Sequence, residues 1–149
     1  MDVKGKNPKS PQGQNFYNSV WSWRPLVIYC ESLAPNLGTN YEEWHFNNAY
    51  EVTEAQALTL ANILQLELDE GRTKAFEKQY IEDLKNLPDE TCSICKGTGQ
   101  RNDEYVKGEC NKCKGSGKTR PFATYYPFEE QNIREWTLFL QNCGGFKIL

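Results

Sequence analysis

Long hydrophobic runs and an apolar N-terminal segment are absent from this sequence. The longest uninterrupted apolar run, Leu26 to Cys30, is far shorter than the roughly 20 residues that a membrane-spanning helix requires. Residues 1–15 are basic and polar and contain no apolar stretch of the kind found in secretory signals. These two absences argue against a membrane partner and against export. We therefore expect a cytoplasmic protein.

Histidine is almost absent, because His45 is the only one in 149 residues. Without a second histidine, and without a Ser or Cys neighbour beside it, His45 belongs to no recognisable catalytic set. We therefore predict no enzymatic activity and interpret His45 as a structural residue. The string around it could instead line a pocket for a small molecule or a nucleotide, which is a third functional hypothesis. The residues of that possible pocket are Trp44, His45, Asn47 and Asn48.

The chain is long enough for one ordinary domain with appendages. Hydrophobic residues make up 38% and aromatic residues 13% of it, which suffices for a core and excludes disorder throughout. Residues 1–15 contain only Met1 and Val3 as apolar residues, so they predict a flexible tail. We expect the four tryptophans to lie mostly in the core, although those near Arg24 could form an interface.

Four segments carry helical signals. A short helix is predicted over residues 24–33. The capping-box pattern at residues 53–56 predicts the start of a second helix that ends near Gly71. A third helix over residues 73–86 is expected to pack antiparallel to the second, and an apolar stripe over residues 133–143 predicts a fourth. The fold class is therefore mainly α (α+β).

Cysteine is concentrated in a repeated motif. Residues 92–99 and 110–117 both fit the pattern C-x-x-C-x-G-x-G, with fourteen residues between Cys95 and Cys110. Each pair can present two thiolates from one tight turn, and the intervening segment is long enough to bring the two turns face to face. Four thiolates form a closed tetrahedral shell around one zinc ion. The glycines can adopt positive φ angles, which the sharp turns after the ligands require.

This repeat resembles the cysteine-rich zinc domain of DnaJ-type co-chaperones, which carries four such copies and binds two zinc ions. The resemblance covers residues 90–120 only, and two copies imply one zinc ion and contacts with other polypeptides. The family's His-Pro-Asp tripeptide is missing, since Phe46 follows the single histidine, so stimulation of a heat-shock ATPase is not implied. The zinc ligands that the resemblance implies are Cys92, Cys95, Cys110 and Cys113.

Alternatives to a structural zinc site are thiol-disulfide exchange through one Cys-x-x-Cys pair and a zinc-regulated redox switch. The first needs an exposed thiolate of low pKa, and bound zinc would occupy that thiolate. The remaining cysteines, Cys30 and Cys143, lie on apolar stripes, and we interpret them as buried free thiols.

Charge is unevenly distributed although the net charge is only −3. Residues 92–120 carry seven basic and three acidic residues, a formal charge of +4, and residues 1–24 carry +3, whereas the rest carries −10. The basic segment could contact nucleic acid, an acidic protein or the acidic remainder of the chain. Its possible partner-binding residues are Lys96, Arg101, Lys107, Lys112, Lys114, Lys118 and Arg120.

Together these patterns predict a small helical domain with an inserted zinc-stabilised β-hairpin module. The expected division is a tail at 1–15, an aromatic-rich helical body at 16–88 and 121–149, and a zinc module at 89–120. The leading functional hypothesis is a non-catalytic adaptor, chaperone-like in that its zinc module contacts a protein partner. The alternative is a nucleic-acid-binding protein that uses the basic module and the basic N-terminal segment.

Overall fold

The computed structural model describes residues 1–149 as two compact units. We name the first unit the body; it comprises residues 1–81 and 126–149. The second unit, the cysteine module, comprises residues 82–125 and is longer at both ends than the module predicted from sequence. Four α-helices and small antiparallel sheets make this a mixed α+β fold, as predicted. No helix is both long enough and apolar enough to cross a membrane.

Local sequence signals explain the helices of the body. Helix α1 (Val20–Leu33) begins earlier than predicted because the Ser19 hydroxyl caps it, accepting from the Ser22 backbone N–H at 3.1 Å. Helix α2 (Glu54–Asp69) starts at the predicted capping box, in which Thr53 and Gln56 bond reciprocally at 3.3 and 3.0 Å. Helix α3 (Arg72–Asn86) and helix α4 (Glu130–Asn142) also lie close to their predicted bounds.

Three of the four tryptophans form the centre of the body, as predicted, whereas Trp21 is 41% exposed. Trp23, Trp44 and Trp136 are completely buried. The Trp136 ring meets Trp23 edge-on at 5.4 Å and stacks on Phe139 at 5.2 Å between ring centroids. The Trp23 indole N–H donates to the Trp44 carbonyl at 2.7 Å, so its polar atom is satisfied in the core.

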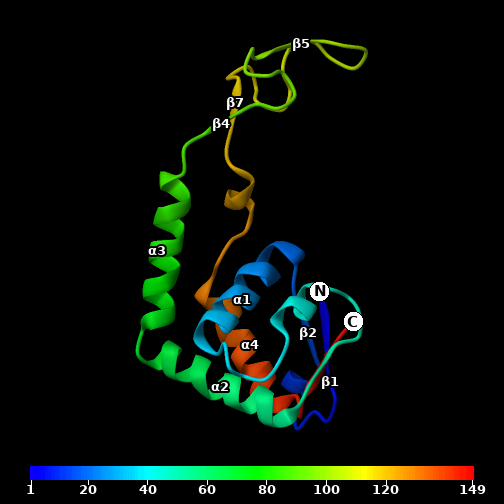
Figure 1. Cartoon of the computed structure of the whole chain (residues 1–149), viewed down its shortest axis with the longest axis vertical. Coiled ribbons are helices and arrows are strands. Elements are labelled where there is room, and N and C mark those ends of the chain that lie inside the picture. Colours follow the sequence, from blue (N-terminus) through cyan, green and yellow to red (C-terminus); the bar gives the residue numbers. More distant parts are fainter. The chain divides into compact units, whose positions relative to one another are not determined.

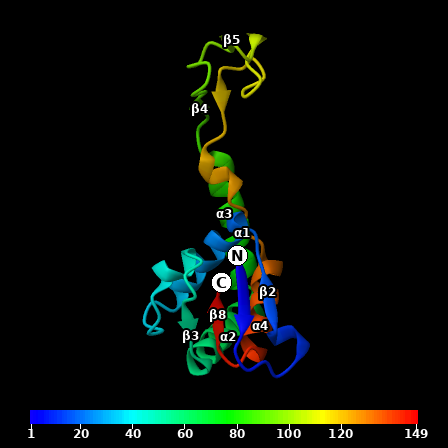
Figure 2. The ribbon, with the colours of Figure 1, turned by 90° about the vertical axis from the view of Figure 1, so that its right-hand side faces the viewer.

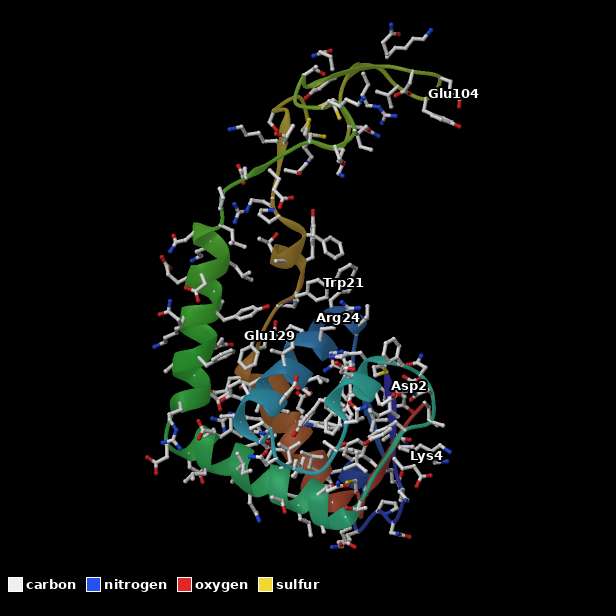
Figure 3. All side chains as sticks on the ribbon, viewed as in Figure 1. Asp2, Lys4, Trp21, Arg24, Glu104 and Glu129 are labelled. Atoms are coloured by element: carbon white, nitrogen blue, oxygen red, sulfur yellow. The ribbon has the colours of Figure 1, made fainter.

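A four-stranded antiparallel sheet lies beside helices α1, α2 and α4 (Figures 1 and 2). Its order is β2 (Asn15–Tyr17), β1 (Asp2–Gly5), β8 (Phe146–Ile148) and β3 (Glu51–Val52). Val3 stands opposite both Phe16 and Ile148, and these three side chains are buried. Asp2 and Lys4 alternate with Val3 and remain exposed (Figure 3).

The structure differs from the flexible tail that was predicted for residues 1–15. Beyond strand β1, the backbone N–H groups of Asn7 and Lys9 donate to the carbonyls of Cys143 and Asn142 at 3.1 and 2.8 Å, after the last turn of α4. The approach is so close that a Cβ atom on Gly13 would lie 2.0 Å from the Asn142 oxygen. Backbone groups and glycine make these contacts, so a search for apolar side chains could not detect them.

Helix α3 does not pack antiparallel to α2, contrary to the prediction. The two helices are separated only by Glu70 and Gly71, and Gly71 has φ +72°. In the body, Phe76 of α3 packs against the rings of Tyr29 and Phe128, each at 4.7 Å. These contacts turn α3 away from α2, and the ribbon changes direction sharply at their junction (Figure 1).

The cysteine module contains two short antiparallel ladders. Strand β4 (Glu90–Thr91) pairs with β7 (Lys118–Thr119), and the hairpin strand β5 (Gln100–Asn102) pairs with β6 (Lys107–Glu109). Asp103 shapes the hairpin turn, because its carboxylate accepts from the N–H groups of Tyr105 and Val106, both at 2.9 Å. Glu104 lies in this turn (Figure 3). The predicted hairpin is therefore present between the two cysteine motifs.

Candidate metal centre

Four cysteine side chains of the module converge on one point. The Sγ atoms of Cys92, Cys95, Cys110 and Cys113 all lie within 4.8 Å of one another, and the four residues are buried. Across the two motifs, Cys92 and Cys110 are 4.0 Å apart and Cys95 and Cys113 are 3.7 Å apart, measured between Sγ atoms. Four buried cysteines in this arrangement could hold a metal ion.

The two motifs are built alike and interlock. The N–H of Cys92 donates to the Gly117 carbonyl, and the N–H of Cys110 donates to the Gly99 carbonyl, both at 2.9 Å. Within each motif, the last glycine N–H donates to the second cysteine sulfur, at 3.2 Å in the first motif and 3.3 Å in the second. Each motif therefore supplies a backbone hydrogen-bond acceptor to the other.

The last glycine of each motif is required for two separate reasons. Gly99 and Gly117 have φ angles of +73° and +75°, which side chains disfavour. A Cβ atom on either one would also lie 2.3 or 2.4 Å from a backbone oxygen of the opposite motif, at Gly115 or Gly97. The C-x-x-C-x-G-x-G spacing thus encodes the close approach of two backbones as well as the ligands.

The surroundings favour thiolate at two of the sulfurs, Cys95 and Cys110; for Cys110, a hydrogen bond from the Cys113 backbone is the main cause of the lowered pKa. Burial raises the pKa of the Cys95 thiol, but hydrogen bonds from Gly99 and from the neighbouring cysteines outweigh burial and lower that pKa to about 6. Its partner Cys113 has a raised pKa, first because it is buried and then because the neighbouring sulfurs repel a second negative charge. A divalent cation would remove this repulsion and allow all four sulfurs to be thiolates.

Two of the six distances between the sulfurs match the edge of a tetrahedral metal site, and the remaining ones are at most 4.8 Å. With metal–sulfur bonds of about 2.3 Å, the edges of a tetrahedron of sulfurs measure about 3.8 Å. The two measured distances across the motifs, 4.0 and 3.7 Å, are close to this edge.

Comparison with protein-family models, curated proteins and solved structures finds no match for this chain. The resemblance to DnaJ-type zinc domains thus rests on the motif residues alone and stays a prediction.

The seven basic residues predicted to bind a partner fall into two groups. Arg101 pairs with Asp103 at 2.7 Å, Arg120 pairs with Asp89 at 2.8 Å, and Lys112 donates to the Ser93 hydroxyl at 3.0 Å. These three therefore have partners within the module. The lysines that make no such contact and are exposed are Lys96, Lys107, Lys114 and Lys118.

Arg120 has a structural role in addition. Its guanidinium donates to the carbonyls of Leu84 and Leu87 at 2.6 and 2.7 Å, where it satisfies backbone oxygens at the C-terminal end of α3.

The predicted pocket string around His45 is dispersed. Trp44 is completely buried, and its indole N–H donates to the Thr39 hydroxyl at 3.0 Å. Asn47 and Asn48 are exposed, and Asn48 donates to the Glu43 carboxylate. Among the four residues of the predicted pocket, His45 lines a cavity, and the other residues of that cavity were not predicted.

That cavity lies between α1 and the short 3-10 helix Tyr41–His45. Its lining residues are Arg24, Ile28, Glu42, His45 and Phe46. The sequence carries no signal for this cavity, because the exposure of Ile28 and Phe46 is seen only in the structure and only tertiary structure brings them together.

The two cysteines outside the motifs are free and fully buried, as predicted. Burial raises the pKa of Cys30 to about 12 and that of Cys143 to about 11. Both side chains are therefore neutral thiols at physiological pH and belong to the core of the body.

Proposed function

We propose that Cys92, Cys95, Cys110 and Cys113 bind one zinc ion whose role is structural. The main support is that these four cysteines form the only buried hydrophobic cluster of the cysteine module. Without a metal, the module has no apolar core that offsets the entropy of ordering its chain. A structural zinc site contributes roughly 10–16 kcal/mol of apparent binding free energy, which is ample for a unit of this size.

A closed site of four thiolates leaves no coordination position for a substrate. We therefore propose that the protein is non-catalytic and that the module acts through its surface, as a chaperone-like or adaptor domain that binds another protein. Ile94 and Tyr105 support this proposal, because their side chains are 48% and 81% exposed on a unit that the metal would hold rigid. The four exposed lysines of the module favour a partner with an acidic surface.

Nucleic acid is a second candidate, and a specific observation supports it. Lys96 and Lys114 occupy equivalent positions in the two motifs, directly after a metal-ligating cysteine, and have φ angles of +54° and +52°. Their backbone is fixed by the knuckles, and their ammonium groups make no ion pair within the chain. Fixed, unpaired lysines are suited to phosphate contacts, and the module also exposes three aromatic rings that could stack on bases, those of Tyr105, Phe122 and Tyr125.

The number and identity of bound metal ions are measured by native mass spectrometry and metal analysis of the full chain. We expect one zinc ion per chain and loss of that ion in the Cys92→Ser variant. Cys30→Ser is the matched control, since it removes a buried thiol of the body and should leave the zinc content unchanged. A metal-free protein whose module retains dispersed amide resonances would refute the structural role.

The partner is tested by reversing the charge of the two knuckle lysines. A Lys96→Glu/Lys114→Glu variant should lose capture of proteins from a lysate of the native host, whereas a Lys4→Glu/Lys78→Glu variant with the same net charge should retain it. Labelled single and double strands are tested in parallel. A shift that weakens steeply with salt, and that the knuckle variant abolishes, would replace the protein partner by nucleic acid.

A further inference from the structure

A cavity in the body combines apolar walls with charged groups. It has a volume of about 320 Å³ and lies between α1 and the 3-10 helix Tyr41–His45. Its apolar walls come from Ile28 and Phe46, which remain 58% and 61% exposed. This volume is at the small end of ligand sites in proteins, so the cavity suits a ligand smaller than a nucleotide.

Charges of both signs line this cavity without neutralising each other. Arg24 and Glu42 make no ion pair with each other or with any other residue. The Arg24 guanidinium lies over the Tyr126 ring, 5.8 Å from its centroid, and this contact restricts the side chain while leaving its hydrogen-bond donors available. Figure 3 shows Arg24 beside Trp21 near the start of α1.

His45 adds a polar group that lacks a partner. Its Nδ1 atom is inaccessible to solvent and makes no hydrogen bond. Burial lowers the pKa of His45, and the nearby Arg24 lowers it further, so the imidazole is neutral at pH 7. The cavity therefore presents one cation, one anion and a neutral imidazole among apolar side chains.

We propose that this cavity binds a small zwitterion, specifically a free α-amino acid with an apolar side chain. The Arg24 guanidinium would donate two hydrogen bonds to the carboxylate, and the Glu42 carboxylate would accept a hydrogen bond from the ammonium group. Ile28 and Phe46 would cover the apolar side chain. A nucleotide fits less well, because one arginine faces its several phosphate charges and Glu42 repels them.

The proposal is tested by recording amide resonances of the zinc-loaded full chain during titration with individual amino acids at millimolar concentration. We expect leucine, isoleucine or phenylalanine to shift the resonances of Arg24, Ile28 and Phe46. The amide of the same amino acid lacks the carboxylate, and its N-acetyl derivative lacks the ammonium group. Each should bind at least about tenfold more weakly, as expected for loss of one charge-assisted contact.

Matched variants separate the charges from the fold. Arg24→Gln should weaken binding of the amino acid and leave binding of its amide unchanged. Glu42→Gln should weaken binding of the amino acid and leave binding of its N-acetyl derivative unchanged. Lys78→Gln and Glu90→Gln remove one exposed charge of each sign elsewhere and should have no effect. The proposal is overturned if no amino acid shifts the cavity resonances, or if the amide and N-acetyl forms bind as tightly as the zwitterion.

Discussion

Replacing Gly13 with alanine tests how firmly the N-terminal segment is attached to the body. The added Cβ atom would lie 2.0 Å from the Asn142 carbonyl oxygen and 2.8 Å from the Cys143 nitrogen, which are backbone atoms that cannot rotate away. Gly13 does not have a positive φ angle, so the collision alone would cause any destabilisation. The chain must separate from the end of α4 to relieve it.

The magnitude follows from the contacts that would be lost. Forcing one extra carbon into a packed site typically costs about 1–3 kcal/mol. Each of the backbone hydrogen bonds from Asn7 and Lys9 contributes roughly 0.5–1.5 kcal/mol, and both are at risk when the segment moves. We expect Gly13→Ala to lower the free energy of unfolding by about 2–6 kcal/mol, the sum of these contributions. Since domains have stabilities of about 5–15 kcal/mol, the variant still folds over most of this range.

Urea unfolding followed by tryptophan emission measures this loss in the body alone, because all four tryptophans lie there. Gly71→Ala is the control. A Cβ atom on Gly71 meets nothing within 4 Å, so its positive φ angle of +72° should cost only about 1–2 kcal/mol. If Gly13→Ala is as stable as the parent protein, or less destabilised than Gly71→Ala, the N-terminal segment is not tightly packed against the end of α4.

Three further predictions concern the body. Thr73→Val removes the buried 3.0 Å hydrogen bond to the Tyr29 hydroxyl and should cost about 1–3 kcal/mol in urea unfolding, whereas a neutral result would mean that water replaces the threonine. When a chelator has removed the metal, we expect the four thiols of the two motifs to react with an alkylating reagent at pH 8. Cys30 and Cys143 should not react, because both are buried and their pKa values are raised. Six modified thiols in the mass spectrum would contradict this. The folded state lowers the pKa of His45, so the unfolded chain binds the proton more readily and stability should fall as the pH drops below about 6.5. In the His45→Gln variant, the thermal-unfolding midpoint should fall less steeply below about pH 6.5. An unchanged slope would mean that other groups cause the pH dependence.

Local signals made the cysteine cluster and the helices predictable from sequence. The ligands occur as two closely spaced pairs, so their convergence requires only one loop closure, and the capping box at Thr53 depends on residues three positions apart. The sheet of the body depends on the opposite kind of contact. Val3 pairs with Ile148 across nearly the whole chain, and strands of two to four residues carry too little alternation to be recognised.

The cavity was not predictable for a related reason. Arg24 and Ile28 share one face of α1, while Glu42 and His45 are neighbours on a separate 3-10 helix, and only folding places the two pairs around one space. The position of Trp44 next to His45 in sequence was misleading, because adjacent residues of such a helix point in different directions. Trp44 consequently enters the core while His45 lines the cavity.

The ladder between β4 and β7 has an evolutionary consequence. It holds Glu90 and Thr119 opposite each other as antiparallel partners, so the ends of the segment 90–119, which contains both cysteine motifs, are about 5 Å apart. A segment with adjoining ends can be gained by a gene in one insertion, or lost in one deletion, with little strain on the host protein. The module therefore has the geometry of a transferable cassette, and proteins that share it need not share any part of the body.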